Sequence, residues 1–462
     1  MTAGGPSRMD SITEAMRAAA PAGETPGAIG DRLHAHCAAL FPICRSITGP
    51  GLRATLRYLA ARIPLAIREV PTGTPLFDWT VPEEWTPRTA WIRRLSGETV
   101  VDFGAHSLHL VQYSQALPEQ VMRREELDRH LHSLPGQPDL IPYRTAYYGR
   151  TWGFCLPHAV RTAMRDEAYR VHVDADLSPG AVSYGECVLP GATAEEVLVS
   201  IHSCHPSLAN DNLSGMALGL ELARWLAARA DRRLTWRFLF VPGTIGSLAW
   251  LAANRDGAVR RVRHGMVLTC LGDGGPLTWK RSRRGDAPVD RIAAQVLRHE
   301  APGNRIIPFE PYGYDERQYC SPGFDLPVGS LMRSPNGTFP EYHTSADDLG
   351  FVRPEHLARS FAALLRIAEA IEHGGRVPVS TSPFGEPQLG RRGLYAPIGG
   401  TGPEDGAAAA RGYRQMALLW VLNLADGRHS LLDMAERADL PFAEILAAAE
   451  AARAAGLLAE PG

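Results

Sequence analysis

Two imidazoles and a carboxylate lie within ten residues of one another in the run HSCHPSLANDNLSG, at His202, His205 and Asp211. Zinc prefers imidazole nitrogen and carboxylate oxygen as ligands, and in catalytic sites it keeps one position open for water. Such a water ionises near neutral pH and can attack an amide carbonyl. The simpler interpretation is that Asp211 or Asn212 caps a helix and that the histidines lie on a surface loop.

A second polar run, EYHTSADD, contains Glu341 and His343. A single histidine in a loop is seldom a metal ligand. Together with the first run, however, it completes a set of two imidazoles and one carboxylate of the kind that binds zinc. The sequence therefore predicts a zinc site formed by His205, Asp211 and His343, with His202 as a competing ligand.

The elements that must position these residues alternate between strand and helix. Short apolar runs predict buried strands, and longer amphipathic runs between them predict helices. The expected strands are 196–204, 234–243 and 264–273, and the expected helices are 212–230 and 246–255. This alternation predicts an α/β fold with a mostly parallel sheet and helices on both faces. Ligands of such sheets bind beyond the carboxyl ends of the strands, where His202, His205 and Asp273 are expected.

Changes in composition divide the chain further. A stretch rich in Trp, Tyr and Pro predicts an inserted β-rich module that could cover the site as a lid, with strands at 106–114 and 169–177. The last segment reads as three short helices and a wing, and so predicts a winged helix. The expected divisions are a disordered tail (1–26), the α/β domain (27–68 and 189–376), the insert (69–188), a linker (377–410) and the winged-helix-like domain (411–462).

The overall composition argues against several partners. The formal net charge is −2, which does not indicate nucleic acid or an anionic membrane. Residues 411–462 carry five arginines and seven acidic residues, the wrong balance for binding phosphates, so packing or homo-oligomerisation is expected of them. The chain has seven cysteines without a CxxC pair, and its N-terminal run lacks the apolar core of a signal peptide. No apolar run is long enough to span a membrane. A cytoplasmic protein without disulfides is expected.

Several long motifs carry a resemblance to a known family. The first polar run, together with PGTIGS, CLGDGG, DERQYCSPG and EYHTSADD, resembles the bacterial aminopeptidase-like zinc peptidases. These are relatives of the M28 peptidases and were long described as domains of unknown function. The likeness also covers FPICRSITGPG, the insert and the C-terminal segment, and so spans nearly the whole chain.

The resemblance implies roles for particular residues. M28 peptidases hold two zinc ions on a bridging aspartate, a position that Asp211 matches here. The last histidine of the family matches His343, and Asp273 matches a ligand of the second ion. The family also carries a Glu-Glu pair after the next strand, but this chain has Val-Pro-Gly-Thr at 241–244 instead. One zinc ion is therefore expected, with two as the alternative.

Without that pair, the general base must come from elsewhere. Asp315 and Glu316 lie where M28 peptidases carry an Asp-His pair that lines the site, and Glu316 is the expected base, with Glu341 as the alternative. These three acids could also neutralise the free amine of a substrate. Two arginines, Arg317 and Arg333, could bind a substrate carboxylate through paired hydrogen bonds.

Two functions follow from these observations. The first is a zinc-dependent hydrolase of the aminopeptidase type that cleaves an N-terminal aminoacyl or small amide bond, in a surface-polysaccharide or specialised-metabolite pathway as the resemblance suggests. The second is a non-catalytic ligand-binding or regulatory protein with a degenerate peptidase domain and a winged helix. A cysteine-protease interpretation, with Cys204 as the nucleophile, leaves the Asp211 position unexplained.

Overall fold

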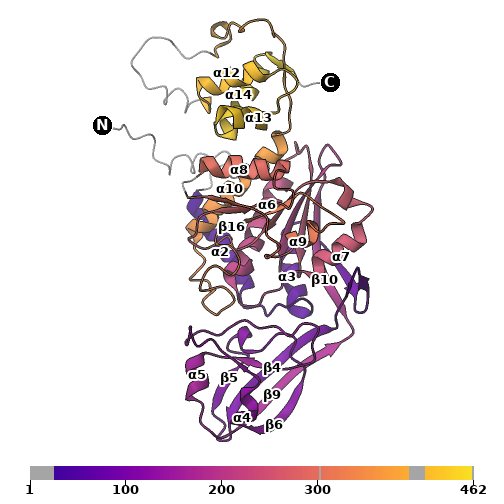
Figure 1. Cartoon of the computed structure of the whole chain (residues 1–462), viewed down its shortest axis with the longest axis vertical. Coiled ribbons are helices and arrows are strands. Elements are labelled where there is room, and N and C mark those ends of the chain that lie inside the picture. Colours follow the sequence, from indigo (N-terminus) through magenta and orange to yellow (C-terminus); the bar gives the residue numbers. More distant parts are fainter. Residues whose placement is uncertain (1–24, 301–302, 395–410, 460–462) are drawn as a thin grey trace, which may run out of the picture. The chain divides into compact units, whose positions relative to one another are not determined.

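The computed structural model describes residues 25–300, 303–394 and 411–459. Within this part the chain forms two compact units: a larger one (residues 25–285 and 307–361) and a smaller one (286–306 and 362–459). The larger unit contains the main sheet and the insert, and the smaller unit contains the C-terminal helices (Figure 1). The predicted disordered tail lies almost entirely outside the described residues, but helix α2 (Pro26–Leu40) already begins at its last residue.

The main sheet has the strand order β1-β10-β12-β11-β13-β16-β14-β15. Its four central strands run parallel, whereas β1, β10 and β14 pair antiparallel at the edges. This mixed sheet confirms the predicted α/β class and adds antiparallel edges to the predicted parallel core. The strands are β1 (Ala66–Pro71), β10 (Ala181–Leu189), β11 (Glu196–His202), β12 (Thr235–Val241), β13 (Val262–Leu268), β14 (Thr278–Lys280), β15 (Arg305–Ile307) and β16 (Val328–Met332).

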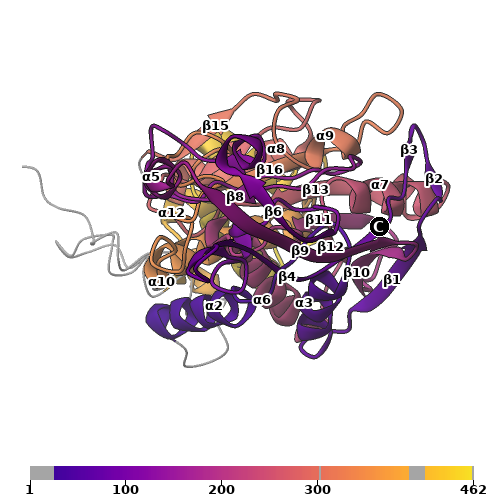
Figure 2. The same cartoon turned by 90° about the horizontal axis from the view of Figure 1, so that it is seen from below.

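Helices cover both faces of this sheet, as the sequence predicts. In the view from below, α2, α3 and α6 lie on one face, and α7 and α9 lie on the other (Figure 2). Helix α6 follows β11, and α7 follows β12, so each returns the chain between parallel strands. Their bounds are α3 (Pro50–Ala60), α6 (Gly215–Ala227), α7 (Ile245–Asn254) and α9 (Glu316–Tyr319). Helix α10 (Pro354–His373) follows the second polar run.

The insert is built on a four-stranded antiparallel sheet with the order β5-β4-β9-β6. The predicted strand at 169–177 is confirmed as part of β9. The predicted strand at 106–114 is wrong: it begins with a 3₁₀ turn, Ser107–His109, because the His106 ring accepts a hydrogen bond from the backbone N–H of Leu108 (3.1 Å). Residues 181–188, assigned above to the insert, form most of β10 in the main sheet. The insert strands are β4 (Glu84–Arg94), β5 (Thr99–Asp102), β6 (Leu117–Arg123) and β9 (Ala168–Ser178).

The smaller unit contains a winged helix, as the sequence predicts. Helices α12 (Gln415–Leu424), α13 (Leu431–Ala438) and α14 (Phe442–Ala454) are followed by β18 (Leu458–Ala459), which pairs with β17 (Val379–Ser380). Strand β17 falls within the segment that the sequence suggested as a linker. Helix α8 (Pro288–Glu300) packs beside α13 and completes the unit. In the described part of the chain, no helix is long and apolar enough to cross a membrane.

Candidate metal centre

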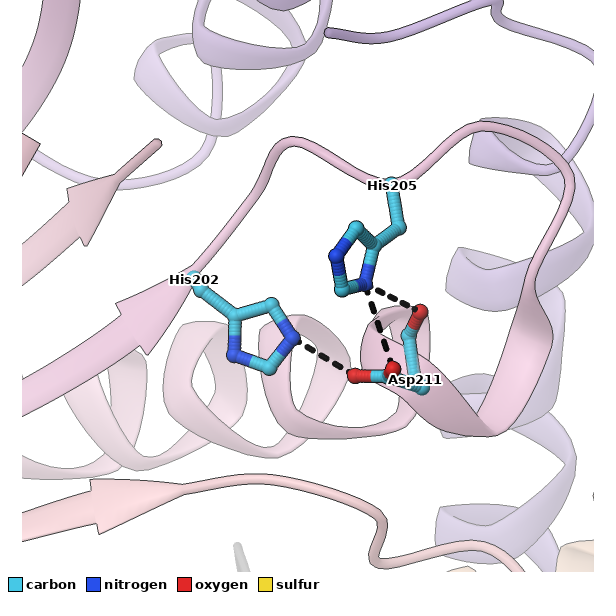
Figure 3. A group of neighbouring side chains, drawn as sticks. All are labelled: His202, His205 and Asp211. Carbon is cyan, nitrogen blue, oxygen red and sulfur yellow. Dashed lines mark hydrogen bonds and ion pairs between the residues drawn. The ribbon is translucent and has the colours of Figure 1, made fainter. Parts of the chain in front are cut away.

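The first three polar groups converge where strand β11 ends. His202 is the last residue of β11, His205 lies in the following loop, and Asp211 lies in an irregular segment just before α6 (Figure 3). The Nε2 atom of His202 is 2.7 Å from Oδ1 of Asp211, and Nδ1 of His205 is 3.2 Å from Oδ2. The three side chains are almost completely buried. One carboxylate therefore lies between two imidazoles at the strand end, where the sequence predicted a site.

The second polar run joins them from a distant part of the chain. The Nε2 atom of His343 is 3.0 Å from Oδ2 of Asp211, and its ring lies 5.2 Å from that of His205, measured between centroids. About a third of the His343 side chain is exposed, so this histidine lies on the open side of the cluster. The structure thus brings His205, Asp211 and His343 together and adds His202 to the same carboxylate.

The charge state of the cluster suits a cation. Burial raises the pKa of Asp211, but the neighbouring His205 and the hydrogen bond from His202 outweigh this and hold that pKa well below its usual range. Burial lowers the pKa values of His202 and His343. Carboxylates bind metal ions in the ionised form and imidazoles in the neutral form, so the pKa shifts of Asp211, His202 and His343 favour metal binding.

These donors fit a zinc ion. His202 Nε2, His205 Nδ1 and an Asp211 oxygen lie within 4.8 Å of one another, and His343 Nε2 approaches the same carboxylate. Imidazole nitrogens with a single carboxylate are typical zinc ligands. The Nδ2 group of Asn212 donates to the carbonyl of Leu268 (2.9 Å) and faces Nδ1 of His202 at 3.2 Å. That donor favours a proton on Nε2 of His202, which then donates to Asp211, and so favours His205 and His343 as ligands.

Asp347 shapes the loop that carries Asp211, a role that the sequence analysis did not assign. Its carboxylate accepts the backbone N–H groups of Asn210 (2.5 Å) and Asp211 (3.0 Å). Burial raises the pKa of Asp347 to about 8. The residue stands in the same polar run as His343, so its closeness to the site was foreseeable, although its hydrogen bonds were not.

The structure places Asp273 in a hydrogen-bonded network near this loop. Its carboxylate accepts from Nδ2 of Asn210 (2.9 Å), the backbone N–H of Gly275 (2.7 Å) and the hydroxyl of Ser334 (2.8 Å). It also accepts from the backbone N–H of Ser334 (3.3 Å), and a carboxylate that already accepts four hydrogen bonds has little capacity left for a second metal ion. Asp273 therefore serves here to orient Asn210 beside Asp211.

The structure gives the acids of the DERQ run different surroundings. The Glu316 carboxylate is buried in an ion pair with Lys280 and accepts the backbone N–H of Tyr314 (3.0 Å). Oδ1 of Asp315 accepts from the hydroxyl of Ser247 (2.9 Å), whereas its buried Oδ2 has no hydrogen-bond partner among the described residues. Burial raises the pKa of Asp315 to about 7. Glu316 is thus occupied by a cation, and its expected role as base lacks support from this geometry.

The remaining predicted residues differ in whether other groups of the fold already engage their side chains. Arg333 is buried and donates to the hydroxyl of Ser360 (2.9 Å) and to the carbonyl of Gly275, so its guanidinium is engaged within the fold. Arg317 is exposed. The half-buried Glu341 has no side-chain hydrogen bond or ion pair within the described residues, and it lies two residues before His343.

Two tyrosines border the imidazoles, and the sequence analysis assigned neither of them to the site. Tyr143 comes from the insert; its ring lies edge-on to His205 (5.1 Å) and His343 (5.0 Å), and its N–H donates to the carbonyl of His343 (2.8 Å). Tyr314 stacks against His202 with ring centroids 3.8 Å apart. The insert therefore contributes directly to the walls of the site. Only the spacing of aromatic residues could have signalled this, and that spacing is also common in cores.

Cys204 is a buried neighbour of the cluster. Burial raises the pKa of its thiol to about 12, and Sγ lies 3.2 Å from the Tyr314 hydroxyl. A thiol in this state is a poor nucleophile and a poor metal ligand, because both roles require the thiolate.

Solved structures show the class of fold. The chain superposes on BSAP, a zinc aminopeptidase from Bacillus subtilis, with a TM-score of 0.53, 11% identity and coverage of 74% of this chain and 95% of that one. It also superposes on an M28 peptidase precursor from Shewanella amazonensis, with a TM-score of 0.52, 15% identity and coverage of 79% and 96%. The larger unit therefore has the fold of the M28-type zinc aminopeptidases.

The family is shown by closer relatives. The model of the domain of unknown function DUF4910 matches residues 34–374, and a winged helix-turn-helix model matches 376–460. The chain belongs to the DUF4910 family and carries a C-terminal winged helix, which confirms the resemblance noted in the sequence. A Clostridium acetobutylicum protein named for polysaccharide biosynthesis and an aminopeptidase-like domain is 43% identical over 412 residues, covering 89% of this chain and 92% of that protein. A crystal structure from the same species, described as a peptidase, has a TM-score of 0.88 at 40% identity, with coverage of 98% and 100%.

Proposed function

We propose that this protein is a zinc-dependent hydrolase of the aminopeptidase type that cleaves an N-terminal aminoacyl or small amide bond. The observation that carries the proposal is the buried Asp211 carboxylate, whose side-chain partners are the imidazoles of His202, His205 and His343. The fold of the zinc aminopeptidases supports it. His205, Asp211 and His343 would hold a zinc ion, which when bound would supply a water of lowered pKa and polarise the scissile carbonyl.

The side chains of the protein divide the remaining tasks. His202 donates to Asp211 and holds the carboxylate toward the other two histidines. A proton acceptor is also required. Of the three acids that the sequence analysis considered, Glu316 is paired with Lys280, whereas Asp315 and Glu341 form no ion pair within the described residues. Glu341, half-buried beside His343, is the group that we assign as base, and Asp315 is the alternative. The insert, through Tyr143, limits the access of water to the histidines.

The substrate is proposed from the class of the fold and from its relatives. Acidic residues such as Glu341, which lies two residues before His343 in the chain, suit a free substrate amine. The relative named for polysaccharide biosynthesis suggests an aminoacylated or amide-bearing sugar precursor as one substrate class. We place the enzyme in the cytoplasm, and we assign the winged helix to packing or homo-oligomerisation.

The decisive experiment combines metal analysis with a substrate panel. Purified protein is analysed by plasma mass spectrometry without added metal, and then assayed against aminoacyl anilides and small amides. About one zinc per chain, together with hydrolysis that a chelator abolishes, is the expected result, since one set of donors is found in the part of the chain that the structure describes. Absence of zinc binding after zinc is added contradicts the proposal.

A second function is favoured by one observation, the ion pair between Glu316 and Lys280 in the place of a free acid. A ligand-binding or regulatory protein with a winged helix would need no base. Zinc binding without hydrolysis of any panel substrate, together with a duplex shift at low salt, would support this alternative. The acidic balance of residues 411–462 predicts no shift.

A further inference from the structure

The ring of Tyr314 occupies space that only a glycine at position 243 leaves open. A Cβ atom added to Gly243 would lie 1.8 Å from Cε1 of Tyr314, far inside any allowed contact. Gly243 follows β12, at the place where M28 peptidases carry their Glu-Glu pair. In this chain, therefore, the carboxylates of the family are absent, and an aromatic ring from another loop fills the space beside that position.

From this position Tyr314 contacts two of the clustered imidazoles in different ways. Its ring lies against His202 with a centroid distance of 3.8 Å and an interplanar angle of 35°. Its hydroxyl lies 3.3 Å from Nε2 of His205, the nitrogen that faces away from Asp211. The ring thus limits rotation of His202, and the hydroxyl lies within hydrogen-bonding distance of Nε2 of His205.

The surroundings of the hydroxyl determine its direction of donation. The carbonyl oxygen of Gly243 lies 3.5 Å from the Tyr314 oxygen, and a carbonyl can only accept. When the hydroxyl donates to this carbonyl, or to Sγ of Cys204 at 3.2 Å, its lone pair is free to accept from His205. Nε2 of His205 then carries the proton, and the lone pair of Nδ1 faces Asp211, whose Oδ2 lies 3.2 Å away and whose backbone carbonyl oxygen lies 3.1 Å away. Both oxygens are acceptors, so this tautomer is the one that a metal ion between them and Nδ1 would stabilise.

We propose that Tyr314 is a positioning residue, for which the glycine at position 243 leaves the necessary space. Its hydroxyl fixes the tautomer of His205 for metal binding, and its ring fixes the orientation of His202, which holds Asp211. The proposal rests on the zinc site described under the proposed function. Metal-binding histidines generally donate their second ring nitrogen to an acceptor, and loss of such an acceptor weakens metal binding by about 10-fold to 100-fold. The phenol of Tyr314 is the acceptor for His205 in this chain.

The test compares two substitutions that differ by one oxygen atom. Y314F keeps the ring against His202 and removes the hydroxyl. Y312F removes the hydroxyl of a tyrosine two residues earlier whose side chain is 64% exposed, and serves as the control. The zinc dissociation constant of the full-length chain is measured by chelator competition, and the visible absorption of the cobalt(II)-loaded protein reports ligand geometry. We expect Y314F to bind zinc about 10-fold more weakly, with an altered cobalt spectrum, and Y312F to match the wild type.

A third variant, G243A, tests the same contact from the opposite side. The added methyl group displaces the Tyr314 ring although every polar atom is retained, so zinc binding should weaken at least as much as in Y314F. Far-UV circular dichroism of the metal-free proteins confirms folding, and if G243A fails to fold, the isosteric Y314F decides alone. Unchanged zinc affinity and cobalt spectrum in Y314F overturn the inference. If the wild type itself binds no zinc, the proposed function fails instead, which keeps the two failures distinguishable.

Discussion

Carboxylates in the metal centre and in the winged helix have different partners. On α13, Asp433 pairs with Arg291 of α8 at 2.7 Å, and Glu436 pairs with the same arginine. On α14, Glu444 pairs with Arg414 at 2.8 Å. These ion pairs are partly exposed. Asp211, by contrast, is fully buried, and its side chain contacts three imidazoles and no arginine or lysine.

The difference separates structural charge from functional charge. Exposed pairs are screened by water and contribute little to the free energy of unfolding. A buried anion costs several kcal/mol unless a cation or hydrogen bonds compensate it. The imidazoles of His202, His205 and His343 are the side-chain partners of Asp211, and a divalent metal ion beside them would supply the compensating positive charge.

The largest effect is expected from H343A. Loss of one of three metal ligands should abolish both zinc retention and hydrolysis, because the remaining donors cannot hold the ion against a chelator. Metal content after dialysis and hydrolytic rate are measured together. R291A, on α8 of the smaller unit, is the matched control and should retain its zinc. Full zinc content in H343A would remove this histidine from the ligand set.

The next effect is on the base. E341Q should keep zinc and lower kcat by about 100-fold to 10,000-fold, because the amide cannot accept the proton of the attacking water. The measurement is the steady-state rate with metal content determined on the same sample. An unchanged rate in E341Q combined with a similar loss in D315N would transfer the role to Asp315.

Glu316 shares a feature with each of the two groups of carboxylates. It is buried like Asp211, but it forms an ion pair, with Lys280, like the acids of α13 and α14. E316Q leaves the ammonium group buried without its partner, and should lower the free energy of unfolding by about 3 kcal/mol. Urea denaturation measures this loss. The double variant K280M/E316L, which removes both charges, should recover part of the stability. Equal stability of E316Q and the wild type, with a large loss of kcat, would restore Glu316 as the base.

Asp315 should make the free energy of unfolding depend on pH. Its pKa is raised from 3.8 to about 7 in the folded state, so the folded protein retains a proton that the unfolded chain releases. Stability from this group is present at low pH and is lost as the pH rises toward about 7. D315N should therefore gain in melting temperature relative to the wild type between about pH 5 and pH 8. A difference that is constant across this range would contradict the raised pKa.

The smallest effect is expected where α8 pairs with α13 of the winged helix. R291A removes two partly exposed ion pairs, to Asp433 and Glu436, and should cost about 1 kcal/mol or less in the free energy of unfolding. The loss should shrink further in high salt because exposed charges are screened. A loss as large as that of E316Q would show that the exposed ion pairs stabilise the protein as much as the buried one does.

Much of the architecture could be predicted from local patterns. The apolar runs that became β11, β12 and β13 are short and bounded by polar residues, and the helices after the first two have a clear apolar face. The insert was harder, because Leu110, Val111 and Tyr113 are all buried in an irregular segment. Consecutive burial of this kind breaks the alternation on which strand prediction depends.

The sequence by itself was enough to predict the candidate metal donors and their approximate place. His202, His205 and Asp211 follow a buried strand within a few residues, and chain connectivity keeps them close whatever the details of packing. Their chemistry, imidazole and carboxylate, was enough to suggest zinc.

Only the tertiary structure decided which neighbours these donors have. The pairing of Glu316 with Lys280, the edge-on contact of Tyr143 with His343, and the position of Tyr314 against Gly243 join residues far apart in the chain. No local periodicity encodes such pairs, because they depend on how separate elements meet across the sheet. The same acidic residue could be a base or a structural anion, and the difference lies in whether a cation folds against it.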